Sequence, residues 1–135
     1  MAGSHRPRPR NWEPLGHVKV TDLRARSGRG PSRSKVKAFS RDWNVVTLLK
    51  GHIDIISDGI KYRLNKTGNP GMTVGGTGDV LAGLVGAFLT RVDKLQGASA
   101  AAYLSGCAGD RAFSRFGYSL LATDVIDNIP DILAQ

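Results

Sequence analysis

The chain has almost no cysteine and no long apolar segment. Cys107 is the single cysteine among 135 residues, so an internal disulfide cannot form and no cysteine spacing indicates a metal site. No apolar run approaches the roughly 20 residues that a membrane-spanning helix requires. The first residues, MAGSHRPRPRNWEPLG, have no apolar segment behind their basic side chains and therefore do not form a secretory signal. We expect a cytoplasmic protein that does not enter a membrane.

Aromatic residues are few, at 7%, and the excess positive charge is confined to one end of the chain. Residues 1–37 contain ten lysines and arginines against two acidic residues, whereas the remainder contains nine residues of each sign. We therefore expect residues 1–40 to be a basic, Pro/Gly/Arg-rich leader, disordered or non-native, and residues 41–135 to form the domain. A nucleic-acid-binding tail is the alternative, disfavoured because no aromatic stacking platform accompanies the charge.

Three short segments between residues 43 and 65 have the pattern of strands. NVVTLLKG is apolar and β-branched, which is typical of a buried strand. HIDIISDG and IKYRLNKTG alternate apolar and polar residues on either side of Asp58-Gly59, a hairpin signal. Within the leader, HVKVTDL alternates like a further short strand.

Three helices are predicted behind these strands. DVLAGLVGAFLTRV is apolar on nearly every side and should be buried all round, and its small residues suggest close approach to a neighbour. LQGASAAAYLSGCAGDRAFSRF predicts an Ala-rich helix with Cys107 in the core and Asp110 and Arg111 on a solvated face. ATDVIDNIPDIL predicts the last helix, with Thr123 as its N-cap and Asp124 in its first turn.

Strands followed by helices predict an α/β layered domain. About three strands offer little area for three apolar helices to cover. We therefore expect a partner chain or further upstream sequence to complete the core, and a homo-oligomer is one way to do so.

The segment GNPGMTVGGTGDVLAG, residues 68–83, combines six glycines with one charge, that of Asp79. Backbone N–H groups at a helix start lack intrahelical acceptors, and glycines leave an anion free to approach them, so GGTG predicts a phosphate site. The Walker pattern is excluded because Lys-Ser/Thr is missing, and the dinucleotide fingerprint fails on its spacing. No residue is assigned as a metal ligand.

Asp79 is expected at the first helical position beside this anion hole. There it can act as general base toward a hydroxyl that attacks a phosphoryl group. The alternative is that Asp79 only caps the helix, which would leave Gly75, Gly76 and Gly78 unexplained because each glycine costs stability.

NPGMTVGGTGDVLAGLVGAFL resembles the signature of the ribokinase-like ADP/ATP-dependent NAD(P)H-hydrate dehydratases. LLKGHIDIISDG and YSLLATDVIDNIPDIL resemble the same family at the expected separations, so the likeness covers residues 43–134. Family domains are about twice this length. The resemblance therefore implies the C-terminal portion of a ribokinase-like three-layer α/β fold, with a few strands, including a hairpin, followed by about three helices.

The resemblance also implies a reaction and a set of site residues. The family phosphorylates the C6 hydroxyl of the (6S)-hydrate of NADH or NADPH with ADP or ATP, then eliminates the phosphate, and Mg²⁺ is expected to bridge the phosphates. Asp79 is the implied catalytic residue, and it contacts substrate together with Asn69. The implied nucleotide-binding residues are Lys50, Gly51, His52, Ile53, Asp54, Gly75, Gly76, Thr77 and Gly78.

Two other functions stay open at this point. A ribokinase-like kinase acting on a sugar or vitamin alcohol would use the same Asp79. A non-catalytic binding module would instead use the basic leader to bind nucleic acid.

Overall fold

The computed structural model describes residues 18–22 and 32–135, with side chains described for 32–135. The order along the chain is β1 (Val18–Asp22), α1 (Arg33–Trp43), β2 (Val46–Lys50), β3 (Asp54–Ser57), β4 (Tyr62–Asn65), the 3₁₀ helix η1 (Pro70–Met72), α2 (Thr77–Leu89), α3 (Lys94–Phe116), the 3₁₀ helix η2 (Gly117–Ser119) and α4 (Ala122–Leu133). The predicted α/β class, with three helices behind the strands, is confirmed.

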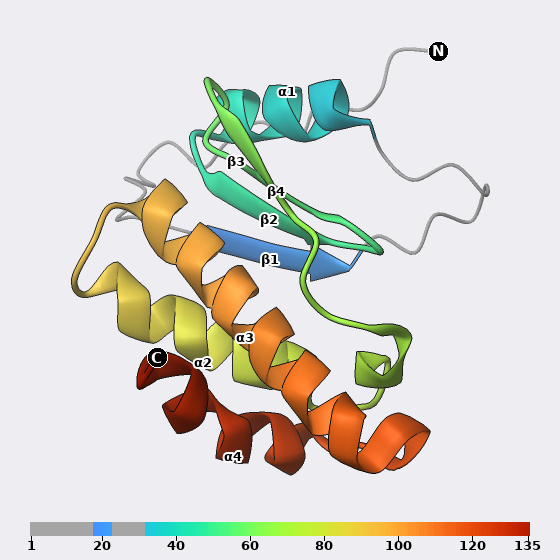
Figure 1. The fold of residues 1–135 in the computed structure, drawn as a ribbon. Helices are drawn as coiled ribbons and strands as arrows, with labels where there is room; N and C mark the ends of the chain where they lie inside the picture. Colours follow the sequence, from blue (N-terminus) through green and yellow to red (C-terminus); the bar gives the residue numbers. More distant parts are fainter. Residues whose placement is uncertain (1–17, 23–31) are drawn as a thin grey trace.

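The strands form one four-stranded sheet in the order β1-β2-β3-β4 (Figure 1). β1 pairs parallel to β2, and the next two pairings are antiparallel, which confirms the short strand expected in HVKVTDL. The predicted hairpin is also confirmed, but residues 58–61, not Asp58-Gly59 alone, connect its strands, and Ser57 lies opposite Tyr62. Gly59 has φ +93°, a conformation that glycine adopts without strain.

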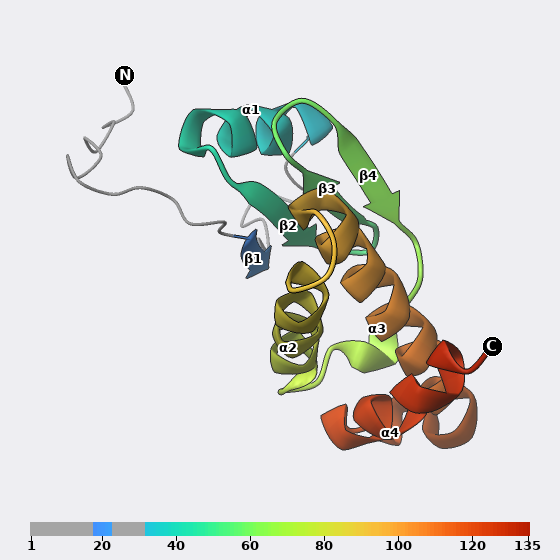
Figure 2. The same ribbon diagram turned by 90° about the vertical axis from the view of Figure 1, so that its left-hand side faces the viewer.

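Helix α1 begins within the segment that the sequence analysis treated as an irregular leader. Val36 and Ser40 are its buried residues, one turn apart, and α1 covers one face of the sheet (Figure 2). The Ser40 hydroxyl lies 2.8 Å from the Thr47 hydroxyl of β2 and so ties the helix to the sheet. With so narrow a buried stripe among basic and polar side chains, α1 left little periodicity for the sequence analysis to detect. The rest of the leader, residues 1–17 and 23–31, lies outside the described residues.

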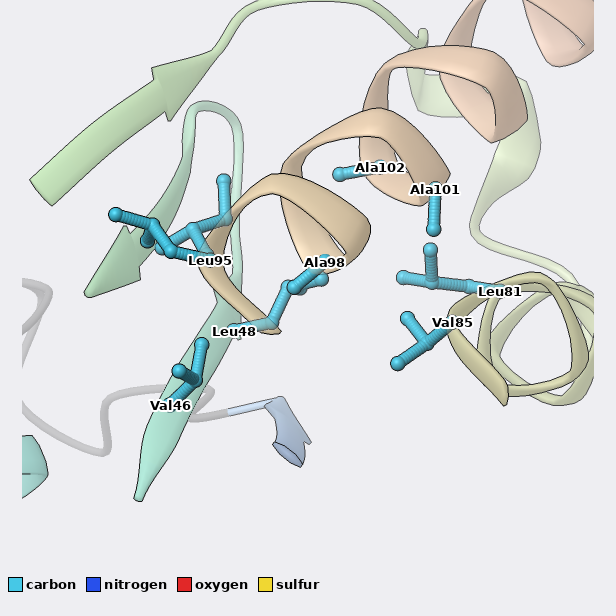
Figure 3. Close-up of a cluster of buried hydrophobic side chains, with 9 residues drawn as sticks. Val46, Leu48, Leu81, Val85, Leu95, Ala98, Ala101 and Ala102 are labelled. Carbon is cyan, nitrogen blue, oxygen red and sulfur yellow. The ribbon is translucent and has the colours of Figure 1, made fainter. Parts of the chain in front are cut away.

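Helices α2 and α3 cover the opposite face of the sheet (Figures 1 and 2). Val46 and Leu48 of β2 face Ala98 and neighbouring residues of α3, while Leu81 and Val85 of α2 close the cluster from its other side (Figure 3). The small side chains of α3 let the helix lie close to both the sheet and α2. This apolar core holds β2, α2 and α3 in fixed relation, and the candidate site is built on these elements.

One face of α2 is exposed, so the expectation that this helix is buried all round is wrong for the described chain. Its buried residues are Thr77, Leu81 and Val85. Gly83 and Gly86 lie on the other side, and a Cβ atom added at either one would meet no atom within 4 Å. That another polypeptide segment covers this face stays a prediction.

Helix α4 packs against α3 and α2 and has Leu121, not Thr123, as its N-cap. The Asp124 carboxylate accepts a hydrogen bond from the Leu121 amide at 2.7 Å, so Asp124 of the first turn stabilises the helix start. Cys107 is only half-buried. Within residues 18–22 and 32–135, no helix combines the length and the apolar character needed to cross a membrane.

Candidate active site

A cleft of about 940 Å³ lies where the sheet, the start of α2 and the middle of α3 meet. After β4 the chain runs past α3 before it enters α2 (Figure 1). Residues of this loop form one wall of the cleft. The lining residues are Lys50, Gly51, His52 and Asp54 from the end of β2 to the start of β3; Thr67, Gly68, Asn69, Pro70, Met72, Thr73, Val74 and Gly75 in the loop; Thr77, Gly78, Asp79, Leu81 and Ala82 of α2; and Ala102, Ser105 and Gly106 of α3.

The chain enters α2 through a glycine turn, residues 75–78, which contains glycines of two kinds. Gly76 is the N-cap with φ +95°, and a Cβ there would lie 2.9 Å from Ala122 Cβ, so backbone geometry and packing require this glycine. Gly75 and Gly78 have neither a positive φ nor any atom within 4 Å of an added Cβ. Their lack of side chains serves no packing or backbone need in the described structure, and it leaves the cleft open beside the helix start.

The first amides of α2 have no acceptor among the described residues. The first helical hydrogen bond runs from Val80 N–H to the Gly76 carbonyl at 3.1 Å, and no described residue accepts from the N–H groups of Thr77, Gly78 or Asp79. These donors carry the partial positive charge of the helix dipole. Free amides beside open space form an anion site that suits a phosphate.

Asp79 is the third residue of α2, not the first as predicted. Its exposed carboxylate makes no hydrogen bond or ion pair with any described residue. Two other aspartates at helix starts behave differently: Asp93 accepts from the Leu95 and Gln96 amides at 3.1 Å, and Asp124 also accepts an amide hydrogen bond. The helix-cap interpretation of Asp79 therefore has no hydrogen bond to support it, although its charge complements the helix dipole.

The Thr77 side chain holds the glycine turn in shape. Its hydroxyl donates to the Met72 carbonyl at 2.8 Å and lies 3.1 Å from the Val74 carbonyl, and the residue is 5% exposed. Gly71 in η1 packs against Phe113, where an added Cβ would come within 2.7 Å of the ring. The turn before α2 is thus fixed by hydrogen bonds of Thr77 and by packing of Gly71 against α3.

The opposite wall follows β2. Lys50 is half-buried and lines the cleft with the exposed His52. Asp54 is 7% exposed; its two carboxylate oxygens accept from the Gly51 amide at 3.1 Å and the Asn65 amide group at 2.9 Å. Because both oxygens have protein partners, Asp54 shapes the turn that presents Lys50 and His52 to the cleft.

The structure brings most of the predicted site residues together. The cleft is lined by Lys50, Gly51, His52, Asp54, Asn69, Gly75, Thr77, Gly78 and Asp79, while Gly76 stands behind it as the helix cap. Ile53 does not join them and instead borders a separate hollow beside Arg33 and Leu64.

Sequence reasoning missed Thr67, Ser105 and Gly106, which also line the cleft. Their positions depend on how the loop after β4 packs along α3, for which the local sequence carried no signal.

No set of side chains in the described ranges forms a metal site by itself: no group of three or more His, Cys, Asp and Glu residues is placed to hold an ion. Asp79 offers one unengaged carboxylate in the cleft. Mg²⁺ usually binds through one or two carboxylates together with phosphates and waters. The residues present therefore fit a Mg²⁺ ion that arrives with a nucleotide.

The NAD(P)H-hydrate dehydratase family of carbohydrate-kinase-like domains matches residues 7–131. The chain belongs to this family. It is 46% identical over 116 residues to the bifunctional NAD(P)H-hydrate repair enzyme Nnr of Archaeoglobus fulgidus, covering 86% of this chain and 25% of that protein. It is 42% identical over 101 residues to the ADP-dependent (S)-NAD(P)H-hydrate dehydratase of Cenarchaeum symbiosum, covering 74% of this chain and 35% of that one.

The fold matches that of a solved family member. An ADP/ATP-dependent NAD(P)H-hydrate dehydratase from Bacillus subtilis, co-crystallised with ATP/Mg²⁺, superposes with a TM-score of 0.67 and 28% identity over 73% of this chain and 37% of that chain. The ribokinase-like fold and the family predicted from the glycine turn are confirmed.

The chain thus spans about a quarter to a third of the curated dehydratase relatives described above. The family match also crosses the predicted boundary at residue 40. Division of the chain into a leader and a domain stays a prediction.

Proposed function

We propose that this chain supplies the phosphate-binding and proton-accepting part of an ADP/ATP-dependent NAD(P)H-hydrate dehydratase site. One observation carries the proposal: Gly75 and Gly78 leave open space at the start of α2, where the first amides and the Asp79 carboxylate have no partner within the described ranges. Family membership and the names of the relatives support the choice of substrate and nucleotide.

In this mechanism the transferring phosphoryl group lies at the start of α2. The amides of Thr77, Gly78 and Asp79 donate to its oxygens and stabilise the charge that develops during transfer. Lys50 adds a positive charge from the opposite wall. Because these donors are fixed by the fold, they need no rearrangement when the reaction occurs.

Asp79 accepts the proton of the C6 hydroxyl of the NAD(P)H hydrate as that oxygen attacks the phosphorus atom. The nucleotide leaves with one phosphate fewer. Inorganic phosphate then leaves C6 while C5 loses a proton to solvent, which forms the C5–C6 double bond and restores the dihydropyridine ring. Asn69, which lines the same cleft, contacts the substrate. Mg²⁺, when bound with the nucleotide, neutralises phosphate charge and orients the phosphates.

The assay for this function uses (6S)-NADHX, the hydrate of NADH, with ADP or ATP. The protein is tested in the longest natural form that contains this chain. Recovery of absorbance at the NADH band is expected only when hydrate and nucleotide are both present. A small-molecule kinase would consume nucleotide with an alcohol substrate and leave the hydrate unchanged, which would contradict the proposal.

The nucleic-acid alternative is tested separately by replacing Arg6, Arg8, Arg10, Arg24, Arg26 and Arg29 with glutamine, because these basic residues lie outside β1 and α1. A salt-sensitive mobility shift that disappears with this replacement would favour that alternative. We expect no such shift.

A further inference from the structure

The loop that forms one wall of the cleft is bonded to α3 at successive residues. The Asn65 amide group donates to the Ala102 carbonyl at 3.2 Å, and the Thr67 hydroxyl lies 3.2 Å from the Tyr103 carbonyl. The fit is close at Gly106, where an added Cβ would collide with Thr67. These contacts fix the first part of the loop, up to Thr67.

Asp110 of α3 fixes the next two residues. One carboxylate oxygen accepts from the Gly68 backbone N–H at 3.0 Å, and the other accepts from Asn69 Nδ2 at 2.8 Å. Gly68 has φ +101°, so the chain turns sharply at the point that Asp110 holds. Asp110 was expected on a solvated helix face; the residue is exposed, yet both of its carboxylate oxygens accept hydrogen bonds.

The carboxylate also determines which way the Asn69 amide points. An ionised carboxylate only accepts hydrogen bonds, so the Nδ2 end of the amide must face Asp110 and the Oδ1 end must face away. Asn69 Oδ1 is buried and has no hydrogen-bond partner among the described residues. Reversing the amide would place two acceptors against each other, so the observed orientation is the stable one.

Asp110 itself does not line the cleft, whereas Gly68 and Asn69 do. We propose that Asp110 is a positioning residue, which holds the Gly68–Asn69 wall and the Asn69 amide in the geometry that the bound nucleotide and substrate require. We call the two hydrogen bonds from Gly68 and Asn69 to Asp110 the Asp110 clamp. Its effect on ligand binding rests on the function proposed above, whereas the clamp itself rests on the two hydrogen bonds.

The variant that tests the clamp is Asp110→Asn, which keeps the size of the side chain but turns one of its two acceptors into a donor. The matched control is Asp131→Asn, which removes the same charge from an exposed ion pair with Arg111 (2.9 Å) between α4 and α3. Asp131 does not line the cleft. Hydrogen exchange of the amides in residues 68–72, ATP affinity by calorimetry and the melting temperature are measured for both variants.

Asp110→Asn should raise amide exchange in residues 68–72 and weaken ATP binding, each by about 5- to 20-fold, as expected for loss of hydrogen bonds to a charged group. Asp131→Asn should change neither quantity. The melting temperatures of the two variants should agree, which separates positioning from a general loss of stability.

Adding Asn69→Asp to Asp110→Asn provides a rescue. The amide introduced at position 110 can accept from the Gly68 N–H and donate to the carboxylate introduced at position 69, which restores both hydrogen bonds with their polarity exchanged. Exchange in residues 68–72 should return to the wild-type rate in this double variant.

Unchanged exchange in Asp110→Asn overturns the clamp. Faster exchange with unchanged ATP affinity overturns its role in binding. If the wild-type protein binds no ATP, the proposed function fails, and the exchange data still decide whether Asp110 holds the loop.

Discussion

At the scale of single residues, Asp79 differs from the other aspartates in the cleft and at helix starts. Asp54 engages both oxygens with protein donors, and Asp93 and Asp124 cap their helices. Asp79 stands at a helix start in the cleft and has no partner among the described residues. Its carboxylate is the one in the cleft that can take a proton from a bound substrate without breaking a hydrogen bond of the fold.

Asp79→Asn tests this role. The substitution keeps the size and the helical position but removes the base, so turnover of NADHX should fall by about 10²- to 10⁴-fold. ATP affinity should stay within a few-fold of the wild-type value, because the amides of α2 remain in place. Single-turnover kinetics and calorimetry on the same preparation measure the turnover of NADHX and the affinity for ATP. Retained turnover would mean that Asp79 only interacts favourably with the helix dipole.

Gly78→Ala should change helix stability and ATP affinity in opposite directions. Alanine has the higher helix propensity, and the added Cβ meets no protein atom within 4 Å, so the free energy of unfolding should rise by about 0.5–1 kcal/mol. The same methyl group enters the space assigned to the phosphate, so ATP affinity should fall about tenfold. Urea unfolding and calorimetry measure the two effects.

Gly86→Ala is the control for this substitution. Gly86 lies in the same helix and its Cβ position is equally open, but it does not line the cleft. Gly86→Ala should raise the free energy of unfolding and leave ATP affinity unchanged. Equal ATP affinity in both variants would mean that the space beside Gly78 is not a phosphate site.

At the scale of elements, the hairpin between β3 and β4 is held by Asp58. Its carboxylate accepts from the Ile60 amide at 2.8 Å and from the Lys61 amide at 2.6 Å. Burial raises the pKa of Asp58, but the hydrogen bonds from the backbone of Lys61 and Ile60 and the charge of Lys61 lower it by more, so its pKa lies below the ordinary value of 3.8.

A lowered pKa in the folded state means that Asp58 stabilises the fold above its unfolded pKa and loses this contribution as the pH falls through the folded value. Asp58→Ala should therefore cost about 1 kcal/mol of unfolding free energy at pH 7. The difference between wild type and variant should shrink when urea unfolding is repeated at pH 3. A constant difference across this range would contradict the role of the carboxylate.

The elements also show what the sequence could and could not predict. β2, α2, α3 and α4 have strong patterns, because each packs apolar side chains into a core. The hairpin was predicted from its alternation and from Asp58-Gly59, although the buried residue of β4 is Asn65. α1 has a narrow buried stripe and was missed, and the exposed face of α2 was predicted to be buried because its composition is apolar. The glycine turn predicted a phosphate site from the local sequence alone, and that site stays a prediction. Ser105 and Asp110 lie on a helix whose relation to the loop only the folded chain reveals.

At the scale of the whole molecule, ligand binding and stability are coupled. A nucleotide that binds only the folded chain at 100 times its Kd should raise the free energy of unfolding by about 2.7 kcal/mol. A thermal shift with ATP or ADP is therefore expected for the wild type and for Gly86→Ala, and a smaller one for Gly78→Ala at the same nucleotide concentration. Equal melting temperatures with and without millimolar nucleotide would contradict nucleotide binding by this chain.

The central claim is that the unbonded amides at the start of α2 hold the phosphate that is transferred. A crystal structure with a non-hydrolysable ATP analogue and Mg²⁺ tests it most directly. We predict phosphate oxygens within hydrogen-bonding distance of the backbone N–H groups of Gly78 and Asp79, with the Asp79 carboxylate facing the terminal phosphate. Phosphates bound elsewhere on the chain, with these amides still unbonded, would contradict the account.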